Sequence, residues 1–219
     1  MRRLSAALAF AALCGAVAIA QRGRVSEAER LQRMSSRFAP TEIRVDLSKV
    51  SGANRKVLAK LVEASTIMDA LFLRQVWVGN EAMRIELAQD QSPEGRARLH
   101  DFLINKGPWD RLDHDKPFVP GAPAKPAGAN FYPEDASKAD LEAWMKSLSE
   151  ADRAKAAGFF TVIRRGTDKG LSIVPYSREY KSDLARAGAL LREAAVLTDN
   201  ASLKKFLVTR ADAFVSNNY

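Results

Sequence analysis

Apolar residues recur at three- and four-residue spacing along most of the chain, which is the pattern of amphipathic helices. The longest such segment runs from about residue 54 to residue 89, and Gly79 is a point where it could bend or break. On this segment Asp69 is expected to form a buried ion pair with Arg74. The predicted buried face consists of Leu58, Leu61, Val62, Ser65, Met68, Phe72 and Val76. Further helices are expected over 26–38, 92–105, about 177–197 and about 200–215, and after Ser137 and Ser149.

Two segments depart from the helical period. Ile43, Val45 and Leu47 alternate with charged residues, which favours a short strand or an extended linker. Two apolar runs flank the turn-forming residues 166–170, and this arrangement predicts a β-hairpin over about 159–175. The predicted fold class is therefore mainly α with a small β-hairpin (α+β).

Residues 107–136 fit neither a helical nor a strand period. They contain six of the nine prolines and four aromatic residues, Trp109, Phe118, Phe131 and Tyr132. A loop of this length inside a domain is usually functional or disordered. Because the aromatic side chains need burial, we expect an ordered loop that is packed across a surface. It either wraps the core of its own domain, or it lines a cleft or packs on further polypeptide.

The N-terminus has the features of a secretory signal peptide. Basic residues at 2 and 3 precede the apolar run 4–17, and Ala18–Ala20 fits an A-x-A cleavage site. We therefore expect a signal peptide at 1–20, a mature domain at 21–219, export to the periplasm or the extracellular space, and no membrane span after cleavage. An uncleaved anchor and lipid attachment at Cys14 are the alternatives.

Composition and charge exclude several classes of protein. Hydrophobic residues make up 47% and charged residues 27% of the chain, as in ordinary globular proteins. A single cysteine excludes a disulfide scaffold and a multi-cysteine metal site. The formal charge is +8, but basic and acidic residues are interspersed along the chain and form no basic stripe. A nucleic-acid partner is therefore not expected.

Several motifs resemble the N-terminal region of peptidase family M49, the dipeptidyl-peptidase III-like group. The two most specific are Gly-Pro-Trp-Asp-Arg at 107–111 and Lys-Pro-Ala-Gly-Ala-Asn-Phe-Tyr-Pro at 125–133. Segments 68–75, 117–119, 174–177 and 209–214 are similar to that region in the same order. The resemblance implies one helical lobe of a two-lobed zinc metallopeptidase that removes dipeptides from peptide N-termini. The partners that it implies are a peptide substrate and a missing catalytic lobe.

The zinc motif of that family, H-E-x-x-G-H, does not occur in this sequence. His100 and His114 are the only histidines, and neither is followed by glutamate. Zinc is thus implied by the family, but its ligands are not present in this chain, and no catalytic or metal-binding residue is predicted. We expect the N-terminal fragment of an exported dipeptidyl peptidase, inactive alone because it lacks the zinc-binding catalytic half. The alternative is a complete, non-enzymatic, exported helical binding module that uses the 107–136 loop.

Candidate binding residues lie in the same loop. Asn130 and Tyr132 could contact a peptide, since an amide pairs with peptide backbone and a tyrosine combines an apolar ring with a polar tip. A structural role in the loop is expected for Trp109, Asp110, Arg111 and Phe131. Within this group, Asp110 and Arg111 are expected to form an ion pair or a turn.

Overall fold

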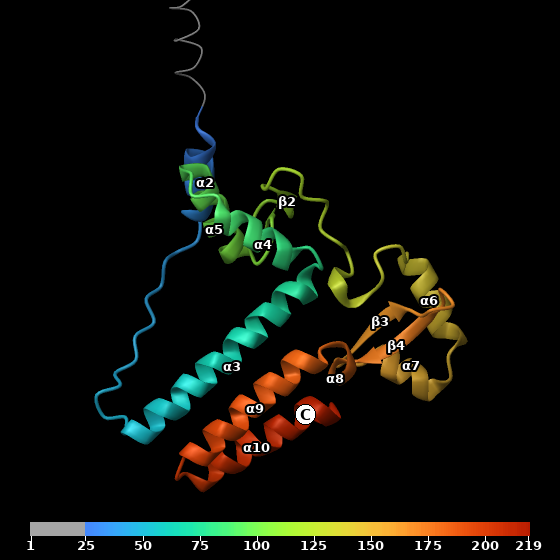
Figure 1. Cartoon of the computed structure of the whole chain (residues 1–219). Coiled ribbons are helices and arrows are strands. Elements are labelled where there is room, and N and C mark those ends of the chain that lie inside the picture. The colour runs from blue at the N-terminus through green and yellow to red at the C-terminus, as the bar shows by residue number, and fades with distance from the viewer. Residues whose placement is uncertain (1–24) are drawn as a thin grey trace, which may run out of the picture.

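The computed structural model describes residues 25–219, so the predicted signal peptide lies outside the described residues. Its elements are α2 (Glu27–Ser35), α3 (Gly52–Val76), α4 (Asn80–Gln89), α5 (Pro93–Asn105), β1 (Trp109–Asp110), β2 (Lys116–Pro117), the 3-10 helix η1 (Ala129–Phe131), α6 (Lys138–Ser147), α7 (Glu150–Ala156), β3 (Thr161–Arg165), β4 (Leu171–Pro175), α8 (Tyr176–Glu179), α9 (Lys181–Leu197) and α10 (Ala201–Ser216) (Figure 1). The protein is mainly helical with two small antiparallel sheets, which confirms the predicted fold class.

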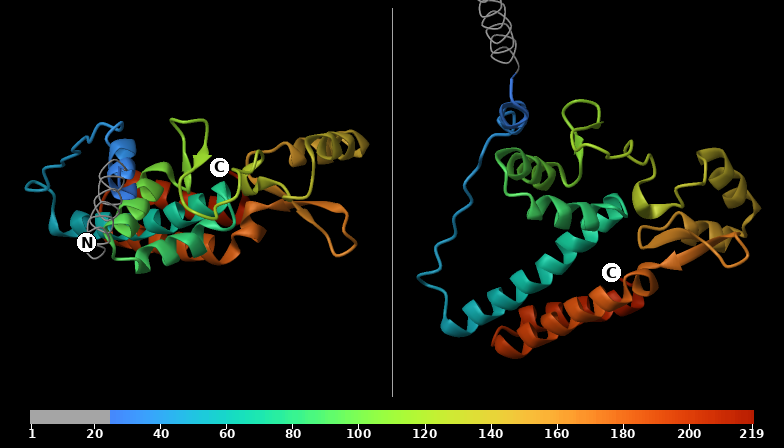
Figure 2. Two further views of the ribbon diagram at one scale, coloured as in Figure 1. Left: turned by 90° about the horizontal axis from the view of Figure 1, so that it is seen from above. Right: turned by 45° about the horizontal axis from the view of Figure 1, so that its top comes forward.

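Three long helices form the main body of the molecule. α9 runs antiparallel to α3, and α10 returns alongside α9 (Figures 1 and 2). Their shared core is made of small and branched residues, among them Val57, Ala194 and Leu207. None of the helices within 25–219 is long and apolar enough to cross a membrane.

A second group of helices sits at the C-terminal end of α3. α2 packs against α5, and α4 packs against both α3 and α5. Phe102 and Leu31, neither of them accessible to solvent, lie at the centre of this group. The Arg98 guanidinium clamps α2 by donating to both carboxylate oxygens of Glu27, at 2.8 and 2.7 Å.

The predicted hairpin is present as β3 and β4, with Ile163 opposite Ile173 in an antiparallel register. Gly166 and Gly170 close its turn through a backbone hydrogen bond of 2.8 Å. Val162 anchors the hairpin to the helical body, because it packs in one cluster with Ile67 of α3. α6 and α7 lie beside the hairpin (Figure 1).

Serine caps fix where many of the helices begin. Ser26 and Ser137 each form a complete capping box, and Ser51, Ser92 and Ser149 accept a backbone N–H of the first turn. Such caps satisfy N–H groups that have no partner inside the helix. The helix starts expected at 26, 92, 137 and 149 are therefore confirmed.

The predicted buried face of the long helix is wrong in part. Leu58, Val62 and Phe72 are 40%, 63% and 48% exposed, whereas the buried residues are Val57, Ala64, Ile67, Leu71 and Leu73. Apolar residues occur on several sides of α3, so spacing alone permits more than one stripe. α9 covers the side that carries Val57, Ala64, Ile67 and Leu71, and Leu73 packs against the second group of helices. The pattern of α3 by itself does not reveal these partners.

The expected Asp69–Arg74 pair is also wrong. Asp69 is more than half exposed and pairs with Lys106 at 2.8 Å, and Arg74 pairs with Asp183 of α9. Residues five apart on a helix do not face each other, which is why the two side chains diverge. The helix expected over about 177–197 is in turn divided into α8 and α9 at Tyr180.

The side chain of Asp101, on α5, is a buried carboxyl group. It is 1% exposed, and neither carboxylate oxygen forms a hydrogen bond with a residue of the described chain. Burial raises the pKa of Asp101 to about 6, and the nearby charge of Asp110 adds to the increase. Positive charge on His100, Arg30 and Arg37 opposes it. The folded protein therefore favours the protonated form of this group.

Asp101→Asn is expected to stabilise the protein at pH 7 and above by about 2–3 kcal/mol, because each pKa unit corresponds to ~1.4 kcal/mol. The folded pKa lies above the unfolded one, so the stability contributed by the protonated carboxyl is complete below about pH 4 and is lost as pH rises through about 6. Urea unfolding of both proteins between pH 4 and 8 measures the difference. A difference that does not grow with pH would contradict the assignment, and the exposed Asp199→Asn serves as the control.

Candidate functional site

The 107–136 loop begins with a short hairpin. Lys106 ends α5 in a left-handed conformation (φ 58°), and Trp109 and Asp110 then pair with Pro117 and Lys116. The Phe118 amide donates to the Pro108 carbonyl at 2.9 Å, which extends this pairing. After Val119 the chain crosses the C-terminal end of α3 and reaches η1 and α6 (Figure 1).

Asp110 and Arg111 do not pair with each other. Asp110 is 6% exposed, accepts a hydrogen bond from the Arg37 guanidinium, and also accepts the Leu112 amide at 3.0 Å. Arg111 donates to the Asn105 carbonyl at 2.8 Å. The expected ion pair is wrong because consecutive side chains point apart, while the expected turn is present at Asp110. Asp110 thus ties the loop to the chain just after α2, and Arg111 ties it to the end of α5.

Trp109 and Phe131 are the apolar anchors of the loop. Trp109 is 3% exposed, and its indole N–H donates to the Pro123 carbonyl at 2.8 Å. Its ring meets Trp77 edge-on, with ring centroids 5.5 Å apart. Phe131 packs against the cluster that contains Ile67 and Val162. The two aromatic residues thus attach opposite ends of the loop to different parts of the core.

Asn130 occupies a junction inside the molecule. Its side-chain amide donates to the Arg74 carbonyl at 2.8 Å, and its own carbonyl accepts the Arg164 guanidinium at 3.0 Å. Arg164 also donates twice to Glu179, at 2.9 and 2.7 Å. The donor group of Asn130, proposed from the sequence for peptide contact, is therefore engaged in joining α3, η1 and β3.

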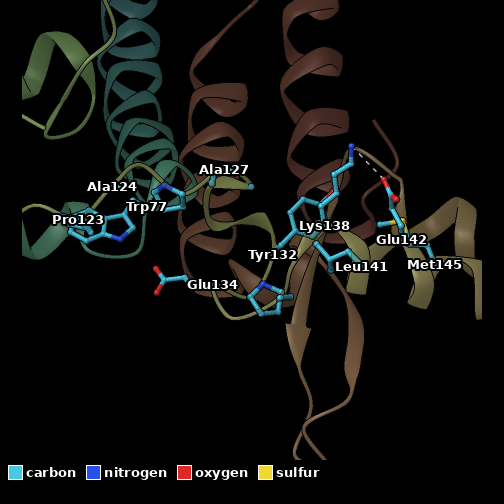
Figure 3. A pocket seen from close by; sticks show the side chains of 15 residues that line it. Trp77, Pro123, Ala124, Ala127, Tyr132, Glu134, Lys138, Leu141, Glu142 and Met145 are labelled. Carbon is cyan, nitrogen blue, oxygen red and sulfur yellow. Dashed lines mark ion pairs between the residues drawn. The ribbon is translucent and has the colours of Figure 1, made fainter. Parts of the chain in front are cut away.

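Tyr132 lies on a cavity of about 710 Å³ between the loop and α6 (Figure 3). Trp77 lines the opposite side, and Leu141 and Met145 of α6 complete the apolar wall. The remaining lining residues are Pro123, Ala124, Pro126, Ala127, Gly128, Ala129, Pro133, Glu134, Ala136, Lys138 and Glu142. Asn130 is not among them, so the structure does not bring the two candidate peptide-binding residues together.

Glycines allow both aromatic rings of this cavity to lie where they do. A Cβ atom on Gly79 would come within 2.3 Å of the Trp77 ring, and one on Gly128 within 2.8 Å of the Tyr132 ring. Real structures do not tolerate such contacts, so each ring requires its glycine. The shape of the cavity therefore depends on two residues that have no side chain.

The polar groups of the cavity lie on its α6 side and its rim. Lys138 pairs with Glu142 at 3.6 Å, and Glu134 is exposed. Apolar walls with a few charged groups suit an aromatic or aliphatic side chain of a ligand. The lining offers no cysteine, serine or histidine that could serve as a nucleophile or base. The polar side chains of the lining are those of Tyr132, Glu134, Lys138 and Glu142.

The two histidines do not create a metal site. His100 is exposed on α5, and His114 is exposed in the β1–β2 turn with a positive φ of 53°. No group of three His, Cys, Asp or Glu side chains within 25–219 is placed to hold a metal ion. The described residues do not fit the zinc site that the family resemblance implies.

Sequence reasoning missed Trp77, Leu141 and Met145 as parts of the candidate site. Trp77 follows directly after α3 and precedes Gly79 by two residues, and this spacing is a signal that could have identified it. Leu141 and Met145 are spaced by one helical turn on α6, which indicates an apolar face but not what it covers.

Comparison with solved structures finds this fold elsewhere. The structure of dipeptidyl-peptidase III from Corallococcus sp. strain EGB is 53% identical with a TM-score of 0.86, and the match covers 90% of this chain and 36% of that one. Dipeptidyl-peptidase III from Caldithrix abyssi is 46% identical with a TM-score of 0.80, over 86% of this chain and 35% of that one. This chain resembles one part of dipeptidyl-peptidase III.

The similarity to dipeptidyl-peptidase III confirms the resemblance to family M49 that the loop motifs predict. The chain spans about a third of the length of each of these structures. Among curated proteins, Nudix hydrolase 3 of Arabidopsis thaliana is 32% identical over 253 aligned residues, which cover 92% of this chain and 33% of the plant protein. No protein-family model matches the chain.

Gly79→Ala is expected to destabilise the protein by about 1–3 kcal/mol, because the new methyl group displaces the Trp77 ring. Urea unfolding measures the loss, and the tryptophan emission spectrum should shift as Trp77 moves. Gly52→Ala is the matched control, since a Cβ there meets no atom within 4 Å. Equal stability of the two variants would contradict the packing described.

Proposed function

We propose that this chain is one helical lobe of an exported, zinc-dependent dipeptidyl peptidase of the dipeptidyl-peptidase III type. The observation that supports this most strongly is the 53% identity to the Corallococcus structure over 90% of the chain. Because the match covers only 36% of that structure, the proposed activity belongs to a larger assembly. Within this assembly the chain would supply the ordered surface formed by the 107–136 loop and not the catalytic groups.

The zinc-binding half of the proposed peptidase would be supplied by polypeptide that this chain does not contain. The sequence has two histidines and no H-E-x-x-G-H motif, and its described acidic residues form no metal-binding group. Bound zinc in such a peptidase activates a water molecule for attack on the peptide bond. We assign no residue of this chain to that step.

The proposed location rests on the first twenty residues. Basic residues at 2 and 3, the apolar run and Ala18–Ala20 support cleavage after Ala20 and release of a domain at 21–219. The destination would be the periplasm or the extracellular space.

The proposed contact with a peptide substrate centres on Tyr132. Its ring lines the cavity beside α6, whereas the Asn130 amide is held by Arg74. If the chain contributes to peptide binding, the apolar cavity would accept a side chain of the peptide.

A second candidate function is favoured by the same cavity. A volume of about 710 Å³ is within the range of small-ligand pockets. A non-enzymatic helical module that binds a partner through the 107–136 loop would use it without any catalytic half.

A chimera tests the first proposal. The part of the Corallococcus enzyme that this chain matches is replaced by this chain, and hydrolysis of a dipeptidyl arylamide is measured with and without a chelator. Chelator-sensitive hydrolysis within about tenfold of the parent enzyme is expected, because a tenfold loss corresponds to only ~1.4 kcal/mol at the transition state.

Controls for the chimera are the enzyme without the matched part and this chain alone with added zinc. Neither should turn over the substrate. A folded but inactive chimera would contradict the proposal, and so would chelator-sensitive turnover by this chain alone.

Binding to the cavity tests the second candidate. Titration with N-acetyl-phenylalanine amide should change the fluorescence of Trp77, and Tyr132→Ala should weaken binding about tenfold through the loss of an aromatic contact. Tyr219→Ala, which removes a tyrosine that does not line the cavity, should bind like the unaltered chain. Equal affinity of all three proteins would contradict a role for this cavity.

A further inference from the structure

The segment between α2 and α3 is extended over several residues. From Ala39 to Leu47 the backbone forms neither helix nor sheet, and it runs along its own path away from α3 before rejoining that helix (Figures 1 and 2). Both ends are fixed. Arg37 pairs with Asp110 just before the segment, and Arg55 of α3 donates to the Leu47 carbonyl at 2.9 Å just after it.

Side chains along this segment separate into two faces. Ile43, Val45 and Leu47 alternate with polar residues, and they are 87%, 73% and 42% exposed. On the other face Glu42 and Arg44 form an ion pair at 2.6 Å. Strict alternation of this kind is the pattern of a strand with one buried face. Here the apolar face is the exposed one.

The main-chain N–H and C=O groups of the segment also lack hydrogen-bond partners in the described chain. From Thr41 to Asp46 no main-chain N–H or C=O forms a hydrogen bond with another residue of 25–219. An extended chain with free main-chain groups and an apolar side is a template for pairing with another strand. Fixing both ends lowers the conformational entropy that the segment loses on pairing.

We propose that Thr41–Leu47 is a β-strand whose partner is an edge strand in the part of a dipeptidyl-peptidase III polypeptide that this chain does not match. The inference rests on the proposed function. The matched structures extend well beyond this chain, which covers 36% and 35% of them, so ample polypeptide exists to supply the partner. The partner strand offers apolar side chains to Ile43 and Val45 and main-chain groups to the free edge.

A second copy of this chain is the competing occupant. Antiparallel pairing about Val45 would place Arg44 opposite Asp46 of the other copy, which is favourable in charge. Pairing of seven residues, however, covers far less than the ~1,600 Å² that stable interfaces bury. We therefore assign the strand to the larger polypeptide.

The test compares Val45→Arg in two settings, the chimera described above and this chain alone. In the chimera the substitution should lower the melting temperature by several degrees, because it places a charge in the new sheet. In the isolated chain, where Val45 is exposed, the melting temperature should not change. Arg44→Gln on the polar face is the matched control and should change neither.

Four outcomes overturn the inference. An unchanged chimera means that the strand has no partner there, and an equal loss in both proteins means that Val45 is packed within the chain itself. A dimer of the isolated chain in size-exclusion chromatography that Val45→Arg abolishes would assign the strand to a second copy. A chimera that fails to fold contradicts the proposed function and this inference together. A folded, inactive chimera contradicts only the proposed function, since its melting temperature still reports on the strand.

Discussion

The hydrogen bonds around Asn130 are the constraint on which the arrangement of this protein depends. The Asn130 side chain is held by the last turns of α3, and its carbonyl is held by Arg164 of β3. Arg164 is in turn paired with Glu179, and both side chains are about three-quarters buried. Charge-assisted hydrogen bonds are stronger than neutral ones, and partial burial protects them from screening by salt. One residue of the loop therefore joins the helical body to the hairpin.

This junction determines what the proline-rich loop can do. Because η1 is fixed to α3, the Tyr132 ring that follows is directed to the cavity beside α6. Trp77 approaches the same cavity from the end of α3, and Gly79 provides the space that its ring needs. The wall formed by these residues is thus set by contacts inside the chain.

The sequence predicts the elements better than their contacts. Helix starts at Ser92 and Ser137 are readable because a capping serine acts within its own turn, and the hairpin is readable because its period changes locally. The buried face of α3 cannot be predicted in this way, because Val57 and Leu58 are both apolar and only the packing of α9 buries Val57 rather than Leu58. Asn130 meets partners that are 56 and 34 residues away, and local pattern carries no information about such pairs. The prolines, the aromatic residues and the missing period single out the 107–136 loop, but they do not show which of its residues face inward.

Amide hydrogen exchange of the isolated chain tests most directly whether the loop is a fixed wall. The amides of Phe118 and Phe131 donate to carbonyls within the loop, whereas those of Thr41–Asp46 have no partner in the described chain. Our account predicts that Phe118 and Phe131 exchange far more slowly than residues 41–46, at rates closer to those of α3. Exchange of both loop amides as fast as that of residues 41–46 would contradict it.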